Sequence, residues 1–457
     1  MKVLRCNLWV LVLIMTALPA LSGCGGAPDL MPTPNLYRDH QKDPFADVAE
    51  PLQNNKVEVL YLTDRRPENK SAEYREYGYK RSRSVAFGIS HVEFGKDVSW
   101  EDLKKASRTG KRDVKLPVAV TRTEELGRFP PTPRTLVELP TPAEAATQPA
   151  TTPATIAVEI DTAKEAASAL LTRELAKTPV KDVYIFVHGY NNTFYDGVMT
   201  IAQLWHFMGR QGVPISYSWP AGSKGLLRGY TYDRESSEFT VFHLKEMLRF
   251  VAAHPDVQRI HVIAHSRGTD VAASALRELH LEIRGSGKST RDELKLNTLI
   301  LAAPDLDIDV VIQRLVTARI GRVPDRFALY VCAEDEALGI SNWLFSGIQR
   351  LGKIRSNIFT PQELVALRNS KSVQIVDARV SNPGASGHSY FYSNPAVSSD
   401  LILLLRYGLA PGPDNGRPLR VARDGFWVID DKYPDPARVA RVKAATTQKV
   451  ATTQEIR

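Results

Sequence analysis

The amino-acid sequence predicts an α/β fold with a mostly parallel, doubly wound sheet and flanking helices. Through the middle of the chain, short runs rich in Val, Ile and Leu alternate with amphipathic stretches of helical periodicity. Such runs, bounded by polar turns, are typical of parallel strands that are buried on both faces of a sheet. Serine, histidine and aspartate residues follow several of these runs. This placement fits the same fold, because catalytic groups gather at the carboxyl ends of parallel strands.

The predicted helices and strands alternate in a regular order. A helical stretch at 162–177 precedes the strand DVYIFVHG, a helix from about 195 to 210 precedes PISYSW, and a helix from about 236 to 253 precedes RIHVIAH. A helix of small residues comes next, followed by the strand runs NTLILAAPD, FALYVCAED and VQIVDARV. Two further strand-like runs, VEVLYLTD and RSVAFGISHVEF, lie nearer the N-terminus.

The 457 residues are enough for one large domain or two ordinary ones. We expect a single catalytic domain over 56–410. Residues 25–55 are rich in Pro, Asp and Asn without periodicity, which predicts a flexible tether. Residues 138–155 are rich in Pro, Ala and Thr and predict an exposed low-complexity insertion. Residues 411–457 form a C-terminal extension, whose end at 437–457 we expect to be disordered.

The first residues have the features of a bacterial lipoprotein signal. The start, MKVLRCNLWVLVLIMTALPALSGCGG, has a basic beginning and then an apolar run too short for a stable membrane span. The tetrapeptide LSGC, ending at Cys24, resembles the lipobox, in which the cysteine is diacylated and becomes the mature N-terminus. An ordinary signal peptide that happens to contain cysteine is the alternative. We therefore expect residues 1–24 to be a lipoprotein signal peptide, and acyl chains on Cys24 to anchor the protein in the bacterial cell envelope, outside the cytoplasm.

The remaining composition argues against disulfides, nucleic acid and cofactors. Cys6 leaves with the signal, and Cys332 stands alone in an apolar strand run, which predicts a small core residue. The net charge of +8 is scattered along the chain, so we assign it to a solvated face near anionic lipid headgroups and expect no nucleic-acid partner. The segment RGSGKST at 284–290 resembles a phosphate-binding loop, but Glu282 stands where that motif needs glycine, so we expect no nucleotide site.

The strongest functional signal is a serine between a strand and a helix. In RIHVIAHSRGTDVAASAL, residues 259–276, the pentapeptide AHSRG is one residue away from the G-x-S-x-G nucleophile elbow. A serine at such a position is often only a helix N-cap. Ala264 and Gly268 are small enough for strand and helix to approach each other closely, as the elbow requires. We therefore predict that Ser266 is a nucleophile.

A serine nucleophile needs a histidine base and an acid that orients it. In the usual chain order of this arrangement, both follow the serine. His280 lies about four turns along the elbow helix, so we predict that His388, in a glycine-rich loop after the last strand run, is the base. Asp335 follows the penultimate strand run and is the predicted acid. Asp305, which follows the preceding strand, is the alternative acid or caps the next helix.

The oxyanion of an acyl-transfer reaction requires two backbone N–H donors. The first predicted donor is the amide of Arg267, directly after the nucleophile. The second is the amide of Tyr190 or Asn191, in the segment VHGYNNTF, where Gly189 lets the chain turn. His188 precedes this loop and is explained better by structural hydrogen bonds than as a base.

Together, VYIFVHGYNNTF, ISYSWPAG, IHVIAHSRG, LILAAPDLD, CAEDEAL and GHSYF resemble an α/β-hydrolase family of unknown function that is related to bacterial esterases and lipases. The resemblance covers about residues 56–410 and implies an α/β-hydrolase fold without metal or cofactor. It implies Ser266 as nucleophile, Asp335 as acid and His388 as base. Arg267 stands where members of the family often carry methionine; a cation there either favours an anionic substrate or faces outward.

These observations predict a membrane-anchored serine hydrolase of the esterase or lipase type. We expect it to cleave a carboxylic ester through an acyl-enzyme, and a phospholipid acyl ester is the more specific expectation. The expected partners are thus an ester or lipid substrate and the membrane itself. A non-catalytic envelope protein that retains the hydrolase fold for binding is the alternative, and amidases or thioesterases would use the same residues.

Overall fold

The computed structural model describes residues 27–40, 43–132, 153–335, 338, 350–354, 360, 362, 365, 372–381, 388–422 and 425–434. The predicted signal peptide, Cys24, most of the insertion at 138–155 and the C-terminal end at 437–457 lie outside the described residues.

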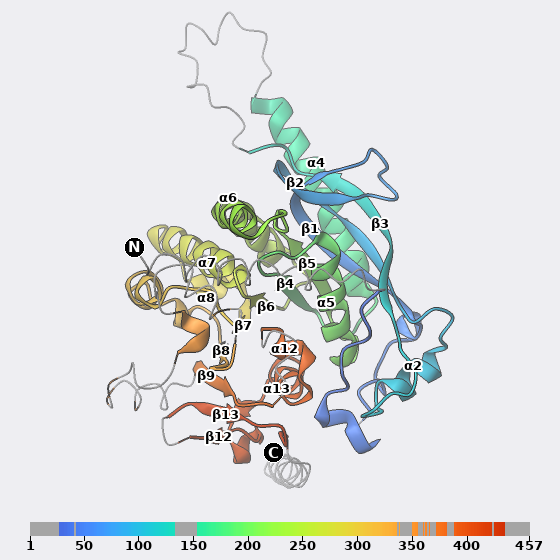
Figure 1. Cartoon of the computed structure of the whole chain (residues 1–457). Coiled ribbons are helices and arrows are strands. Elements are labelled where there is room, and N and C mark those ends of the chain that lie inside the picture. The colour runs from blue at the N-terminus through green and yellow to red at the C-terminus, as the bar shows by residue number, and fades with distance from the viewer. Residues whose placement is uncertain are drawn as a thin grey trace, which may run out of the picture.

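A large sheet organises the described part of the chain (Figure 1). Its 11 strands follow the order β12-β13-β9-β8-β7-β6-β4-β5-β1-β2-β3. The parallel strands at its centre are β4 (Asp182–Val187), β5 (Val213–Ser218), β6 (Arg259–His265), β7 (Leu296–Ala302), β8 (Arg326–Val331) and β9 (Val373–Ala378). The prediction of a mostly parallel α/β sheet is therefore confirmed.

Three long strands extend the sheet on one side. β1 (Lys56–Pro67) pairs in parallel with β5, and β2 (Tyr77–Phe94) and β3 (Val118–Arg128) continue antiparallel. The connection from β2 to β3 carries the short helix α2 (Trp100–Ala106). On the opposite side, β13 (Trp427–Ile429) pairs in parallel with β9, and β12 (Arg420–Val421) forms the edge.

Helices cover both faces of the sheet (Figure 1). Side chains of one face form a core with α4 (Pro153–Ala176), α6 (Leu226–Ala253) and α7 (Gly268–Gly285). Side chains of the other face form a core with α5 (Phe194–Phe207), α12 (Tyr390–Ser393) and α13 (Pro395–Leu405). Successive residues of β4 alternate between these two cores, as the period of two along a strand requires. The remaining short helices are α8 (Thr290–Leu294) and α9 (Ile308–Val310).

The prediction of a flexible tether at 25–55 is wrong for the residues that the structure describes. Leu30 and Tyr37 are buried in the same core as α5, and the Tyr37 hydroxyl donates a hydrogen bond to the carbonyl of Phe207 at 2.9 Å. The apolar residues of this segment pack between α5 and α13 without forming a long helix or strand. Their spacing along the sequence is therefore irregular. The domain therefore begins well before residue 56.

The C-terminal boundary also lies beyond the predicted residue 410. The guanidinium of Arg417, in the two-residue strand β11 (Gly416–Arg417), is fully buried. It donates to both carboxylate oxygens of Asp400 on α13, at 2.8 and 2.7 Å. Tyr433 donates its hydroxyl proton to the same carboxylate. The described residues of 411–434 are thus built into the domain by a buried ion pair.

Replacing Arg417 by leucine should lower the free energy of unfolding by about 3–5 kcal/mol, because it leaves the Asp400 carboxylate buried and unpaired. Urea unfolding followed by circular dichroism measures this loss. Arg420→Leu is the matched control: the Arg420 side chain is 57% exposed where it pairs with Asp430, and such pairs contribute only about 0–1 kcal/mol. Equal losses for the two variants would contradict the structural role of Arg417.

Candidate active site

Ser266 occupies a strained turn between β6 and α7. Its φ angle is 52°, a left-handed conformation that costs a residue with a side chain roughly 1–2 kcal/mol. The backbone N–H of Ser266 donates to the carbonyl of Ala302 at 3.0 Å, and its own carbonyl accepts from the Thr269 hydroxyl at 2.6 Å. Neighbouring backbone thus holds the turn in place. Strain of this kind clusters at functional sites.

Two glycines allow other parts of the chain to approach this turn. A Cβ on Gly268 would lie 2.3 Å from the carbonyl oxygen of His188, at the end of β4. A Cβ on Gly189 would lie 2.7 Å from the Cβ of Ser266. Both distances are far below van der Waals contact, so neither position accepts a larger residue without movement. The expectation that residue 268 must be small is confirmed.

The structure brings His388 and Asp335 together beside this turn. The His388 Nδ1–H donates to Asp335 Oδ2 at 2.7 Å, and Asp335 is completely buried after the end of β8. The backbone N–H of Leu338 donates to the other carboxylate oxygen at 3.1 Å. The arrangement leaves Nε2 as the imidazole nitrogen that accepts a proton. Among the described residues, no hydrogen bond joins the hydroxyl of Ser266 to a partner; catalytic hydrogen bonds are often formed only when substrate is bound.

His265, which sequence reasoning did not assign, lies between these groups. Its ring centroid is 4.7 Å from that of His388, and its Nε2–H donates to the backbone carbonyl of His388 at 3.0 Å. Burial and the neighbouring His388 hold the pKa of His265 well below its usual value. A neutral His265 therefore fixes the backbone that carries His388 next to the serine turn.

Asp305, the alternative acid, has different partners. Its carboxylate accepts from the Tyr230 hydroxyl at 3.1 Å and lies 3.3 Å from Arg350 Nε. Its backbone N–H donates to the carbonyl of Ser266 at 3.3 Å. The cap of the following helix is provided by Asp307 instead, whose carboxylate accepts from two backbone amides. The geometry thus pairs His388 with Asp335, and it places Asp305 next to the backbone of Ser266, where its carboxylate contacts Tyr230 and Arg350.

Of the three amides expected as oxyanion donors, one already has a hydrogen-bond partner within the protein. The amide of Asn191 donates to Asp233 Oδ2 at 2.9 Å, so it is not available to a substrate. The same carboxylate accepts from Gly222 N at 3.1 Å, which ties the loop after β4 to the one after β5. The prediction of Asn191 as an oxyanion donor is therefore wrong. The amides of Tyr190 and Arg267 have no hydrogen-bond partner among the described residues.

Arg65 is the main functional candidate that sequence reasoning missed. It is 1% exposed, and each of its five N–H donors is used. Its acceptors are Ser218 Oγ, the carbonyls of Gly78, Ala221 and Asn192, and His188 Nε2. Burial lowers its pKa to about 10. Its position directly after the strand-like run VEVLYLTD was the available signal, because β1 runs parallel to the central strands and ends at the same edge.

His188 has the structural role that was expected. Its Nδ1–H donates to the carbonyl of Gly189 at 3.0 Å, its Nε2 accepts from Arg65 at 3.2 Å, and its ring stacks on Trp219. Burial and the charge of Arg65 lower the pKa of His188 to about 3. The imidazole is thus neutral and occupied at both nitrogens, which makes it unsuitable as a base.

The side chain of Arg267 does not face outward. It is 7% exposed and pairs with Asp270 at 3.1 Å. Burial lowers its pKa, but Asp270 and Asp305 raise it, and the net shift is upward. Arg267 borders a cavity of about 200 Å³ beside the serine turn, lined also by Tyr230, Arg234, Glu238, Asp270, Leu306, Asp307, Val310, Arg314 and Arg350.

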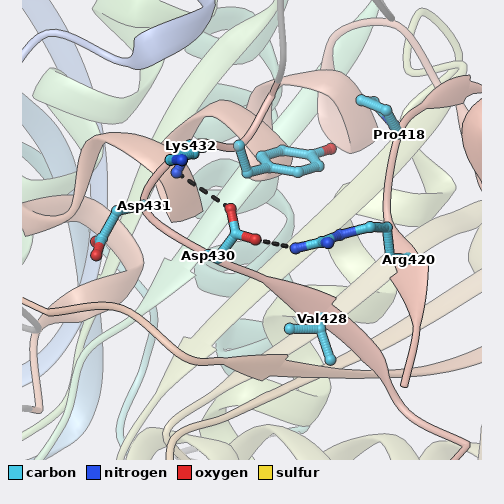
Figure 2. A pocket seen from close by; sticks show the side chains of 7 residues that line it. Pro418, Arg420, Val428, Asp430, Asp431 and Lys432 are labelled. Carbon is cyan, nitrogen blue, oxygen red and sulfur yellow. Dashed lines mark hydrogen bonds and ion pairs between the residues drawn. The ribbon is translucent and has the colours of Figure 1, made fainter. Parts of the chain in front are cut away.

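A larger cavity, of about 440 Å³, lies far from Ser266 at the edge formed by β12 and β13 (Figure 2). Its polar groups bond to one another: Asp430 pairs with Arg420 and accepts from the backbone N–H of Lys432 (Figure 2). Five strand spacings of about 4.8 Å each separate β12 from β6. The edge cavity is therefore remote from the residues at the serine turn.

The expectations for Cys332 and for the segment 284–290 also have a structural outcome. Cys332 is completely buried, and burial raises the pKa of its thiol to about 11. The segment 284–290 lies at the end of α7, not after a strand. Within the described residues, no cluster of His, Cys, Asp and Glu is suited to hold a metal ion. In the same part of the chain, every helix is too short or too polar to cross a bilayer.

A parallel sheet that carries a serine on a strained strand–helix turn, beside a histidine–aspartate pair, defines the class of α/β hydrolases. The chain belongs to the family described as alpha/beta hydrolase of unknown function (DUF900), whose model matches residues 163–406, more than half of the chain. No curated protein matches the chain. The resemblance to a hydrolase family of unknown function is thereby confirmed, and its relation to esterases stays a prediction.

Gly268→Ala should lower the free energy of unfolding by about 1–3 kcal/mol, because the new methyl group overlaps the carbonyl of His188. Gly285→Ala is the matched control at the other end of α7, where a Cβ meets nothing within 4 Å. Chemical denaturation of both variants measures the difference. If the two variants are equally stable, the close approach of α7 and β4 is not a constraint.

Proposed function

We propose that the protein is a serine hydrolase that cleaves a carboxylic ester through an acyl-enzyme intermediate. The observation that carries the proposal is the 2.7 Å hydrogen bond between His388 and Asp335, beside the strained turn of Ser266. A serine hydroxyl is a weak nucleophile until a neutral, oriented imidazole removes its proton. The buried Asp335 holds the imidazole in the tautomer that has Nε2 free.

In the first half of the reaction, Ser266 Oγ attacks the ester carbonyl carbon and His388 Nε2 takes the hydroxyl proton. The carbonyl oxygen becomes an oxyanion, and the amides of Tyr190 and Arg267 donate to it. Collapse of this tetrahedral intermediate breaks the bond to the alkoxy group, which leaves as an alcohol with the proton from His388. The acyl group is then joined to Ser266.

In the second half, a water molecule attacks the acyl carbon while His388 Nε2 accepts one of its protons. The second tetrahedral intermediate is stabilised by the same two amides. Its collapse releases the carboxylic acid, and Ser266 Oγ recovers its proton from His388. Donors that are fixed in advance toward developing negative charge typically contribute about 10²–10³-fold each to the rate.

We also propose that Cys24 is diacylated and anchors the protein in the bacterial cell envelope, outside the cytoplasm. The support is the lipobox-like LSGC after a short apolar run. More than one acyl chain is needed for stable anchoring, and diacylation of the cysteine supplies this.

Ser266→Ala should abolish ester turnover and labelling by a fluorophosphonate, while the unfolding free energy stays nearly constant, because alanine shares the left-handed strain. Ser266→Gly should also be inactive, but more stable by about 1 kcal/mol, because glycine adopts a positive φ without cost. Turnover of a short-chain ester and chemical denaturation measure both effects. An active Ser266→Ala protein would remove the mechanism and favour a non-catalytic binding protein.

Asp335→Asn should lower kcat by about 10⁴-fold, because the amide oxygen keeps the bond from the Leu338 N–H, the amide NH2 faces His388 Nδ1 as a donor, and the imidazole loses its correct tautomer. Asp305→Asn is the matched control, since its carboxylate contacts Tyr230 and Arg350; we expect a loss of stability and a much smaller effect on kcat. Steady-state kinetics of folded proteins distinguish the two residues. A greater loss of kcat in Asp305→Asn would reverse the assignment of the acid.

A further inference from the structure

The first described residues are fixed to a loop at one end of the sheet. Asp29 forms a β-bridge with Pro117, and the backbone N–H of Leu30 donates to the carbonyl of Leu116 at 2.8 Å. The guanidinium of Arg112 donates to the carbonyl of Leu30 at 2.6 Å. We refer to residues 27–31 and 109–117 together as the anchor surface.

Cys24, the proposed site of acylation, is only five residues before Asp29, which forms this bridge. A fully extended chain advances at most about 3.6 Å per residue. Five residues therefore span no more than roughly 18 Å. Acyl chains on Cys24 would hold the anchor surface close to the bilayer, with no long tether to let the domain move away.

The chemistry of the anchor surface suits an anionic bilayer. The connection from β2 to β3, residues 95–117, contains seven basic and four acidic residues. Lys111, Asp113 and Lys115 are the exposed charged residues around Val114. Val114 is 72% exposed, the highest value among the large hydrophobic residues exposed in the described part of the chain. An exposed apolar side chain within a connection of net positive charge is typical of a segment that lies at the interface of an anionic membrane.

The serine turn lies at the other end of the same strands. β1 begins at Lys56, which pairs with Glu93 at the end of β2, next to the connection that carries α2 (Figure 1). Arg65 lies near the other end of β1. Its Nη2 is 3.2 Å from His188 Nε2, and His188 directly precedes Gly189 in the chain. Nine residues of strand, at about 3.3 Å each, separate these ends by roughly 30 Å.

We propose that the anchor surface lies against an anionic membrane and that the sheet holds Ser266 at the aqueous end of the molecule. The proposal rests on the acylation of Cys24 and on the hydrolase activity proposed above. It also revises the expected substrate: an ester reaches Ser266 through water, and the acyl esters of the anchoring leaflet lie beyond reach. A water-soluble ester is therefore the substrate class that this geometry favours over a membrane phospholipid.

Depth measurements with a fluorescent thiol label test the orientation. Val114→Cys and Val310→Cys carry the label at the two ends: Val310 is 37% exposed and lines the same cavity as Arg267, which directly follows Ser266. The native Cys332 is buried and has a raised pKa, so it reacts slowly with the label. The lipidated protein is reconstituted in vesicles of phosphatidylcholine with phosphatidylglycerol that contain a spin-labelled lipid as quencher.

We expect the label at 114 to be quenched several-fold more than the label at 310. Lys111→Gln together with Lys115→Gln should reduce quenching at 114, to the level found in vesicles of phosphatidylcholine alone. Equal quenching at both positions, quenching at 310 alone, or quenching at neither position would overturn the proposal. A mature N-terminus at Cys24 without acyl groups in mass spectrometry would overturn it as well.

The quenching of the label does not depend on turnover. A failure of the proposed orientation can therefore be distinguished from a failure of the proposed hydrolase activity. Ser266→Ala protein should give the same quenching pattern as the unchanged chain. If the protein is active, the reconstituted enzyme should hydrolyse a soluble short-chain ester and leave the phospholipids of its own vesicle intact. Hydrolysis of those phospholipids at a comparable rate would overturn the inferred substrate class, even with the expected quenching.

Discussion

The left-handed turn at Ser266 is the constraint on which the rest of the site depends. With φ at 52°, β6 ends and α7 begins within two residues, and α7 is pressed onto β4 so closely that Gly268 leaves no room for a methyl group. The loop after β4 lies equally close to the serine, because Gly189 has no side chain to meet the Ser266 Cβ. A relaxed turn would move the serine away from this loop. The strain is therefore maintained by backbone hydrogen bonds and close packing, not by the serine side chain.

Arg65 shows how the structure holds the second side of the site. A buried guanidinium without a carboxylate directly against it is costly unless every donor is satisfied. Here all five donors are satisfied. Their acceptors come from β2, from the loop after β4, and from the end of β5 and the residues that follow it. Burial and this charge keep His188 neutral, and because Arg65 donates to Nε2, the proton is on Nδ1, which donates to the carbonyl of Gly189. One cation thus holds the loop after β4, which carries the proposed oxyanion donor Tyr190.

The sequence was sufficient for the parts that follow a regular pattern. Apolar runs alternating with amphipathic helices predicted the central parallel strands. Chain order after Ser266 selected His388 and left Asp335 and Asp305 as possible acids, of which the structure pairs Asp335 with His388. Position alone did not show that the Asn191 amide is taken by Asp233, since that contact joins a loop to a helix 42 residues later. Residues 27–40 were misjudged for a related reason. Their burial depends on a gap between α5 and α13, and no local periodicity reports such a gap.

The outer strands are part of the site and not an appendage. The family model matches residues 163–406, which leaves β1, β2 and β3 outside it. Yet Arg65 belongs to β1, and its carbonyl acceptor at Gly78 belongs to β2. The proposed oxyanion loop is therefore held in place by residues that precede the matched region. The same strands carry the anchor surface at their opposite end, so one element connects the proposed membrane contact with the geometry around Ser266. Because a twisted sheet of paired strands resists bending, the distance between these two ends is set by the fold.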